Sequence, residues 1–289
     1  ILEMQKFLFS CCLSSDDLDH LVDDNNKVIL LSIADDLRAQ LPLDAMLTSE
    51  TAAHLKMQQR ACPTAHVDSF LYSDEQCEEW ASDDVRCLFV VRRCHPLLVP
   101  AAFISHSFSA TELKFLFQNV LPDLSGRTLV DVGSRLGAVL YGGYVYSSAS
   151  RLLGVELSED FVRMQNEMLQ KYKMADRVQV LHADVCTQEV LLQNADVLIM
   201  NNVFEFFMEP SEQVRAWNFI MQNFRRTGCL LVTVPSLRES LDALQDFFAP
   251  LQILLPPGWL EELPVDHNVY LGKDSDPESL ALIHLYRVM

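Results

Sequence analysis

The strongest constraint on the fold is a short apolar segment, residues 128–132, which contains an aspartate and runs into a glycine-containing turn. The segment reads Thr-Leu-Val-Asp-Val, and Gly133 and Gly137 follow before a helix-compatible stretch begins. Gly133 can adopt a positive φ and has no side chain to block a ligand, while Gly137 permits close packing of the next helix. The carboxylate of Asp131 accepts hydrogen bonds from hydroxyl or ammonium groups but repels phosphate. The stretch therefore predicts a buried strand that leads into a nucleoside-binding turn.

Apolar segments and helical patterns alternate along the chain after residue 105. We expect strands at residues 128–132, 152–155, 178–181, 197–200, 229–234, 268–271 and 282–288. Capping-box patterns at residues 109–112 and 236–239 and an N-cap serine at Ser158 mark helix starts, and a further helix is expected over residues 138–150. The alternation predicts an α/β fold, with a doubly wound, mostly parallel seven-stranded sheet covered by helices on both faces.

The first third of the chain has a different pattern. Helical and irregular stretches with acidic clusters dominate before residue 105, and no motif identifies their role. We therefore divide the chain into residues 1–105, a mainly helical N-terminal extension that could act as a substrate lid, and residues 106–289, a Rossmann-like domain.

Polar side chains stand at the ends of four successive expected strands: Asp131, Glu156, Asp184 and Asn201. Ligands of parallel sheets bind outside the carboxyl ends of the strands, so these four side chains should line one crevice. The turn lacks the Gly-x-Gly-x-x-Gly fingerprint of NAD-binding domains, because residues 133–138 read Gly-Ser-Arg-Leu-Gly-Ala, and a Walker loop is absent from the sequence.

These motifs together resemble those of the class I S-adenosylmethionine-dependent methyltransferases. The resemblance covers residues 106–289 and rests on Asp-Val-Gly-Ser-Arg-Leu-Gly at 131–137, Leu-Gly-Val-Glu-Leu at 153–157, His-Ala-Asp-Val at 182–185 and Asp-Val-Leu-Ile-Met-Asn-Asn-Val-Phe at 196–204. It implies methyl transfer from S-adenosylmethionine, with S-adenosylhomocysteine as the product.

The resemblance also implies site residues. Asp131 would lie near the aminoacyl end of the cofactor, Glu156 would accept hydrogen bonds from the ribose hydroxyls, and Asp184 would bind the adenine amino group beside the Val185 backbone. The residues implied in cofactor binding are Asp131, Gly133, Ser134, Gly137, Glu156, Leu157, Asp184, Val185 and Asn201. Asn201, Asn202 and Phe204 would orient the substrate. A loop of similar type, with two prolines that are missing here, occurs in relatives that methylate nitrogen, which weakly favours a nitrogen acceptor.

Arg135 departs from the family pattern, which has glycine at this position. A positive φ there would strain an arginine by roughly 1–2 kcal/mol. We expect a rearranged turn that still binds the cofactor, with Arg135 directed away from the adenosine, so that Arg135→Gly changes stability by no more than about 1 kcal/mol. Alternatively Arg135 plugs the pocket, and the chain is a catalytically inactive cofactor-binding or interaction module on a methyltransferase fold. A third reading is another nucleoside-binding Rossmann-like enzyme.

Composition limits the partners. The formal net charge is −18, which argues against nucleic-acid binding by phosphate neutralisation and favours a small molecule or a basic protein or peptide as substrate. The eight cysteines form no Cys-x-x-Cys pair, so we expect no metal site and reduced thiols in a cytoplasmic protein, although a nuclear one would look the same. Apolar runs are too short to span a membrane, and the oligomeric state cannot be read from the sequence.

Overall fold

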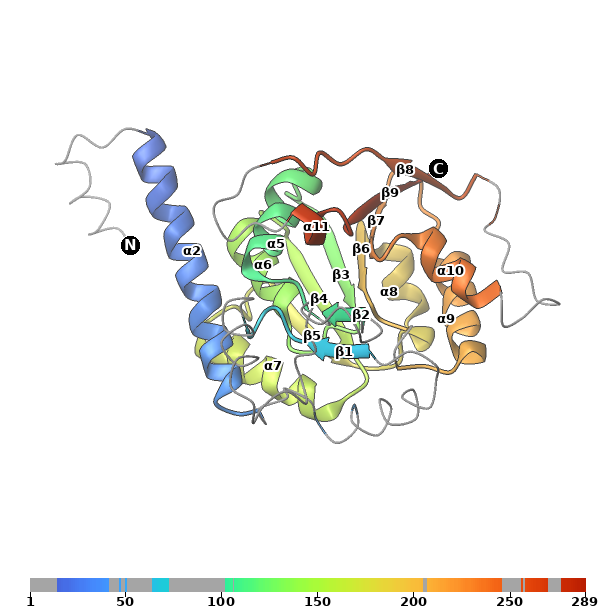
Figure 1. The fold of residues 1–289 in the computed structure, drawn as a ribbon, viewed down its shortest axis with the longest axis horizontal. Helices are drawn as coiled ribbons and strands as arrows, with labels where there is room; N and C mark the ends of the chain where they lie inside the picture. Colours follow the sequence, from blue (N-terminus) through green and yellow to red (C-terminus); the bar gives the residue numbers. More distant parts are fainter. Residues whose placement is uncertain are drawn as a thin grey trace, which may run out of the picture.

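The computed structural model describes residues 15–41, 47, 50, 64–72, 102–105, 107–204, 207–245, 256, 258–269 and 277–289. A seven-stranded sheet with the order β5-β4-β3-β6-β7-β9-β8 forms its centre (Figure 1). Strands β5, β4, β3, β6 and β7 are parallel, and β9 is antiparallel to both of its neighbours. The seven strands are β3 (Thr128–Val132), β4 (Arg151–Glu156), β5 (Val178–His182), β6 (Val197–Asn201), β7 (Leu230–Val234), β8 (Leu260–Leu263) and β9 (His284–Val288).

Helices cover both faces of this sheet, as the sequence predicts (Figure 1). The described helices are α2 (Ser15–Arg38), α5 (Ala110–Phe115), the π-helical turn η1 (Leu116–Val120), α6 (Ala138–Tyr146), α7 (Glu159–Lys171), the short η2 (Val185–Thr187), α8 (Glu189–Asn194), α9 (Pro210–Asn223), α10 (Leu237–Gln245) and α11 (Pro277–Leu280). Helices α5, α6 and α7 pack on one face and α8, α9 and α10 on the other.

The central strand β3 shows how the sequence produces these two layers. Successive side chains of a strand point to opposite faces, and Leu129 accordingly joins the core under α5, α6 and α7, whereas Val130 and Val132 join the core under α8, α9 and α10. All three side chains are buried. Burial on both faces explains why β3 is nearly continuous in apolar residues, with Asp131 as the exception.

The expected helix starts are present. Ser109 and Glu112 form a reciprocal capping box at α5, in which Ser109 N–H donates to Glu112 Oε2 over 2.7 Å. The Ser158 hydroxyl caps α7. Ser236 and Glu239 exchange hydrogen bonds at the start of α10. Each cap satisfies backbone N–H groups that a helix leaves unpaired at its N-terminus, so these local sequence signals fix where the helices begin.

The N-terminal extension packs against the sheet domain through its long helix. The apolar face of α2, which contains Leu30, Ile33 and Leu37, belongs to the same core as α5, α6 and α7. Polar contacts support the packing: Lys171 Nζ lies 2.6 Å from Asp36 Oδ2. The described part of the chain contains no helix that is long and apolar enough to cross a membrane.

Four local features differ from the expectations. Residues 268 and 269 do not form the strand that was expected at 268–271, because Asp266 accepts the N–H of Asn268 in a turn. Residues 270–271 lie outside the described part. The strand beside β9 is instead β8, Leu-Glu-Glu-Leu, whose two adjacent exposed acids do not match the apolar pattern by which strands were predicted. Helix α6 ends at Tyr146 rather than at residue 150. Outside the main sheet, β1 (Thr64–Val67) and β2 (Ala102–Ser105) form a parallel pair that the sequence did not reveal.

Candidate active site

A cavity of about 320 Å³ opens at the carboxyl ends of the central strands. Strands β3 and β6 are neighbours in the sheet, but the chain continues from β3 toward β4 and from β6 toward β7, so the sheet reverses its winding between them. Ligands of doubly wound sheets bind at this switch point. The cavity has the size of a small-molecule site. It is lined by Glu50, Val132, Gly133, Arg135, Val155, Glu156, Leu157, Ser158, Phe161, Ala183, Asp184, Val185, Asn201, Asn202, Val203, Phe204, Phe207 and Met208.

The turn after β3 has the backbone that its glycines suggest. Gly133 has a φ of 69° and Gly137 a φ of 87°, both in the left-handed region. A Cβ atom on Gly133 would lie 3.1 Å from Val203 Cγ1, so a side chain there would press against the opposite wall of the cavity. A Cβ atom on Gly137 would lie 2.8 Å from Tyr141 Cζ on α6. Gly133 therefore leaves room on the ligand side, and Gly137 allows the close helix packing that we expected.

Arg135 adopts the strained conformation that its position in the turn requires. Its φ is 43°, which an L-residue rarely adopts. The backbone is held on both sides: its N–H donates to Glu156 Oε2 over 2.9 Å, and its carbonyl accepts from Gln165 Nε2 over 2.7 Å. Gln165 is itself buried and accepts from the Ser134 hydroxyl over 2.9 Å. These surrounding hydrogen bonds offset the strain of the left-handed residue.

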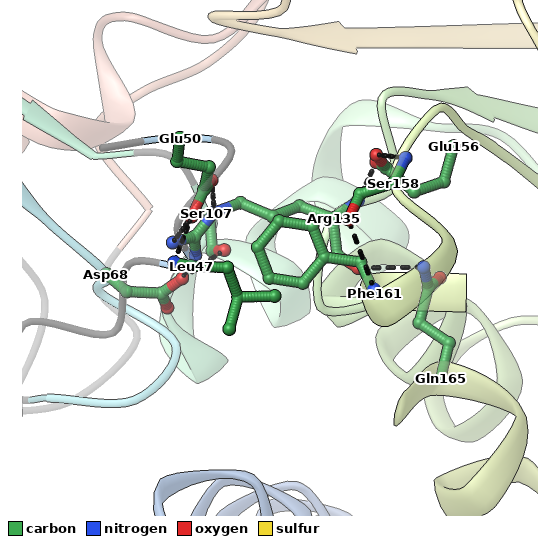
Figure 2. Close-up of polar contacts among 9 residues, drawn as sticks. All are labelled: Leu47, Glu50, Asp68, Ser107, Arg135, Glu156, Ser158, Phe161 and Gln165. Carbon is green, nitrogen blue, oxygen red and sulfur yellow. Dashed lines mark hydrogen bonds and ion pairs between the residues drawn. The ribbon is translucent and has the colours of Figure 1, made fainter. Parts of the chain in front are cut away.

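The guanidinium of Arg135 points away from Glu156, toward the N-terminal extension (Figure 2). Its Nε lies 2.6 Å from Glu50 Oε1 and its Nη2 lies 3.2 Å from Glu50 Oε2, while Nη1 pairs with Asp68 Oδ2. Side-chain exposure is 8% for Arg135 and Glu50 and 1% for Asp68. Burial alone would lower the pKa of Arg135, but the two carboxylates outweigh it and raise the pKa, so the group stays charged.

Asp68 is fully engaged by groups besides Arg135. Its Oδ1 accepts the N–H groups of Phe70 over 3.0 Å and Leu71 over 3.1 Å, and its Oδ2 accepts the Ser107 hydroxyl over 2.8 Å. A buried ion pair is tolerated when such additional hydrogen bonds compensate for lost hydration. We call the four side chains of Arg135, Glu50, Asp68 and Ser107 the Arg135 cluster.

Glu156 ends β4 at the edge of the cavity. Its Oε1 accepts the N–H of Ser158 over 2.8 Å, and its Oε2 accepts the N–H of Arg135. Burial raises the pKa of Glu156, and the two backbone donors oppose this shift. Each carboxylate oxygen has two lone pairs, so both can accept a further hydrogen bond from a ligand.

Asp131 is buried and is not among the residues that line the cavity. Its residue exposure is 4%, and among the residues that the structure describes none donates a hydrogen bond to its carboxylate. Burial, and secondarily the nearby charge of Glu156, raises the pKa of Asp131 well above its usual value. A buried carboxylate in this condition is stabilised by an incoming cation or hydrogen-bond donor.

Asp184 and Asn201 complete the strand-end set. Asp184 caps η2 by accepting the N–H of Cys186 over 2.8 Å, and its other oxygen lies 3.4 Å from Arg215 Nη2. After β6, Asn202 has a φ of 48° and its N–H donates to Val234 O over 2.7 Å. Its amide donates to Asn201 Oδ1 over 3.1 Å. The ring of Phe204, 2% exposed, packs edge-to-face against Trp217, with 5.7 Å between centroids.

The structure brings most of the sequence-predicted residues together. Those that line the cavity are Gly133, Glu156, Leu157, Asp184, Val185, Asn201, Asn202 and Phe204. Asp131, Ser134 and Gly137 are not among the lining residues. Glu50 is a lining residue that the sequence did not reveal, because it belongs to a segment without a motif and nothing there distinguishes it from the other acids of the chain. Phe207 and Met208, also missed, follow the Asn-Asn turn closely enough that position alone could have suggested them.

Comparisons with known proteins leave the family of the chain open. No protein-family model matches the sequence, and neither does any curated protein. Similar solved structures include an RNA methyltransferase from Salinibacter ruber in complex with S-adenosyl-L-homocysteine, with 17% identity, a TM-score of 0.36, and 47% of this chain and 78% of that chain covered. A methyltransferase from Geobacter sulfurreducens has 16% identity, a TM-score of 0.37 and coverages of 62% and 77%.

A third similar structure is the precorrin-6y C5,15-methyltransferase of Geobacter metallireducens, with 13% identity, a TM-score of 0.36 and coverages of 53% and 71%. All three are methyltransferases. At these identities and TM-scores, the likenesses support no statement about activity, which rests on this chain's own residues.

Proposed function

We propose that the cavity binds S-adenosylmethionine and that the chain transfers its methyl group to an acceptor. The observation that carries the proposal is the convergence of a positive-φ glycine turn and three polar strand-end residues, Glu156, Asp184 and Asn201, on one cavity at the switch point. A nucleoside has hydroxyl and amino groups that suit these acceptors. A phosphate-containing nucleotide would meet carboxylates instead.

The residues present suit each part of the cofactor. In this proposal Glu156 accepts hydrogen bonds from the ribose hydroxyls, and Asp184 with the Val185 backbone binds the adenine. Leu157, 61% exposed, borders the cavity beside Glu156. Asp131 is a buried carboxylate beside the glycine turn, and the ammonium group of the aminoacyl end would stabilise its negative charge. Gly133 leaves space that a Cβ would fill.

The chain's own contribution to methyl transfer would be orientation and exclusion of water. S-adenosylmethionine would supply a methyl group bound to a sulfonium sulfur, and the thioether formed from that sulfur is a good leaving group. The amides of Asn201 and Asn202 can hold an acceptor, and Phe207 and Met208 add apolar walls that exclude water. Amide oxygens accept hydrogen bonds from N–H groups, so we propose a nitrogen acceptor on a small molecule or on a protein side chain. The net charge of −18 favours a substrate that carries a cationic group, although the acceptor nitrogen itself must be neutral, with a free lone pair, when it displaces the thioether from the methyl group.

The experiment is a calorimetric titration with S-adenosylmethionine and S-adenosylhomocysteine. Wild-type protein should bind both, and Glu156→Ala should bind about 1.5–3 kcal/mol more weakly, the range for hydrogen bonds to a charged group. Glu159→Ala, a neighbouring acid in the first turn of α7, is the matched control and should bind like the wild type. Absence of binding by folded wild-type protein at millimolar cofactor would refute the proposal.

A further inference from the structure

The Arg135 cluster joins two parts of the molecule that lie far apart in the sequence. Arg135 belongs to the turn at the cavity, whereas Glu50 and Asp68 precede it by 85 and 67 residues. Glu50 also lines the cavity, so the cluster places a piece of the N-terminal extension in the cavity wall. Figure 2 shows the guanidinium between these two acids, with Glu156 on the other side of the Arg135 backbone.

The same residue therefore contacts both the proposed ribose-binding carboxylate and the N-terminal extension. Its backbone N–H holds Glu156, and its carbonyl is held by Gln165. Its side chain lies over the ring of Phe161, with Cζ 5.3 Å from the centroid, before it reaches Glu50 and Asp68. Since these contacts fix both ends of one side chain, a shift of the turn moves the guanidinium, and a shift of the extension moves the turn.

We propose that Arg135 is a positioning residue that couples cofactor binding to the positions of Glu50 in the cavity wall and of residues 68–72. Through Asp68 it holds residues 68–72, whose Phe70 and Leu71 are buried in the core, and through Glu50 it holds one wall of the cavity. Coupling is reciprocal: if the cluster strengthens cofactor binding, the bound cofactor stabilises the cluster by the same factor. The proposal rests on the proposed function, because the cofactor is the ligand that Glu156 would sense.

Buried charge is what makes this coupling specific. Removing Arg135 leaves Glu50 and Asp68 buried without their cation, and the two carboxylates can then be relieved by moving toward water or by taking up a proton. A lysine could approach one carboxylate but lacks the planar fork that spans both. An apolar contact in the same place would hold the extension without making its position depend on the turn.

The test combines amide hydrogen exchange with calorimetry, using the full chain and S-adenosylhomocysteine. In wild type, the ligand should slow exchange in the peptide that contains Phe70 and Leu71 by about tenfold, within the range of measured site-to-site coupling. Arg135→Met should exchange that peptide about tenfold faster without ligand and lose the ligand's effect on it, and should bind about tenfold more weakly. Exchange in β6, a core strand, is measured alongside because it reports any loss of global stability.

Matched variants keep the test decisive. Arg163→Met removes an exposed α7 arginine that pairs with Asp160, and should behave as wild type. Asp68→Asn keeps the side-chain shape and serves if Arg135→Met does not fold. The double variant Arg135→Met/Asp68→Asn should bind S-adenosylhomocysteine no more weakly than the single variant with the lower affinity, because both substitutions remove the same ion pair.

Two results would overturn the proposal: equal exchange of residues 69–72 in wild type and Arg135→Met, or single-variant losses of affinity that simply add. If the wild type binds neither cofactor nor product, the proposed function and the coupling fail together, whereas the ligand-free exchange still shows whether the Arg135 cluster holds the extension. If the ligand binds but leaves the exchange of residues 69–72 unaltered, the proposed function stands and only the coupling falls.

Discussion

Replacing Arg135 by glycine has two opposite effects on the free energy of unfolding, and their sizes can be compared. Glycine relieves the strain of a φ of 43°, worth roughly 1–2 kcal/mol. Against this, removal of the cation leaves two carboxylates, each at most 8% exposed, without their partner. Breaking a buried ion pair on one side costs about 3–5 kcal/mol. We therefore expect Arg135→Gly to lower the free energy of unfolding by about 1–4 kcal/mol, and most of this range lies above the limit of about 1 kcal/mol expected from the sequence alone.

Equilibrium urea denaturation measures this change, with similar m values required for wild type and variant so that the midpoints can be compared. Adding Asp68→Asn to Arg135→Gly should restore part of the loss, because one fewer buried charge is left unpaired. A change below about 1 kcal/mol for Arg135→Gly would show that the two carboxylates reach water when the arginine is absent. The energetic basis of the Arg135 cluster would then be wrong.

Two further predictions concern the turn. The raised pKa of Asp131 means that the folded state holds the proton more tightly than the unfolded state, so this group's contribution to stability falls as pH rises above its unfolded pKa of about 3.9. Asp131→Asn should therefore stabilise the ligand-free protein more at pH 8 than at pH 5 in urea titrations; a difference between variant and wild type that does not vary with pH would contradict this. Gly137→Ala should lower the free energy of unfolding by about 1–3 kcal/mol, because a φ of 87° and a Cβ 2.8 Å from Tyr141 Cζ both oppose it; thermal unfolding measures this, and an unchanged midpoint would contradict it.

The strands and the cavity edge could be predicted because their signals are local. Residues 128–132 form β3 as expected, and the polar residue that ends each parallel strand can be read from the next few positions. The parallel arrangement then places Glu156, Asp184 and Asn201 at one edge whatever their distance in the sequence. The proximity of residues distant in sequence could be predicted because the carboxyl ends of neighbouring parallel strands always lie at the same edge of a sheet.

The partners of Arg135 could not be predicted, because no general geometry connects residue 135 with residues 50 and 68. Glu50 and Asp68 are two acids among many in an acidic chain, and only burial distinguishes them. Asp68 does accept the N–H groups of Phe70 and Leu71, and an aspartate that bonds the backbone two residues further on is a local turn signal. Strand β8 was missed because Glu261 and Glu262 are exposed in a strand with a neighbour on one side only.

The position of β9 has a consequence for the order in which the sheet can form. Strand β8 precedes β9 in the chain, but in the described part of the structure it pairs with the sheet only through β9, which lies between β7 and β8. During synthesis, β8 therefore has no place in the sheet until residues 284–288 have been added, and β7 presents an open edge to other chains until then. A nascent or truncated chain that ends before residue 284 should consequently aggregate more readily than a complete sheet, even though the cavity at β3 and β6 could already have formed.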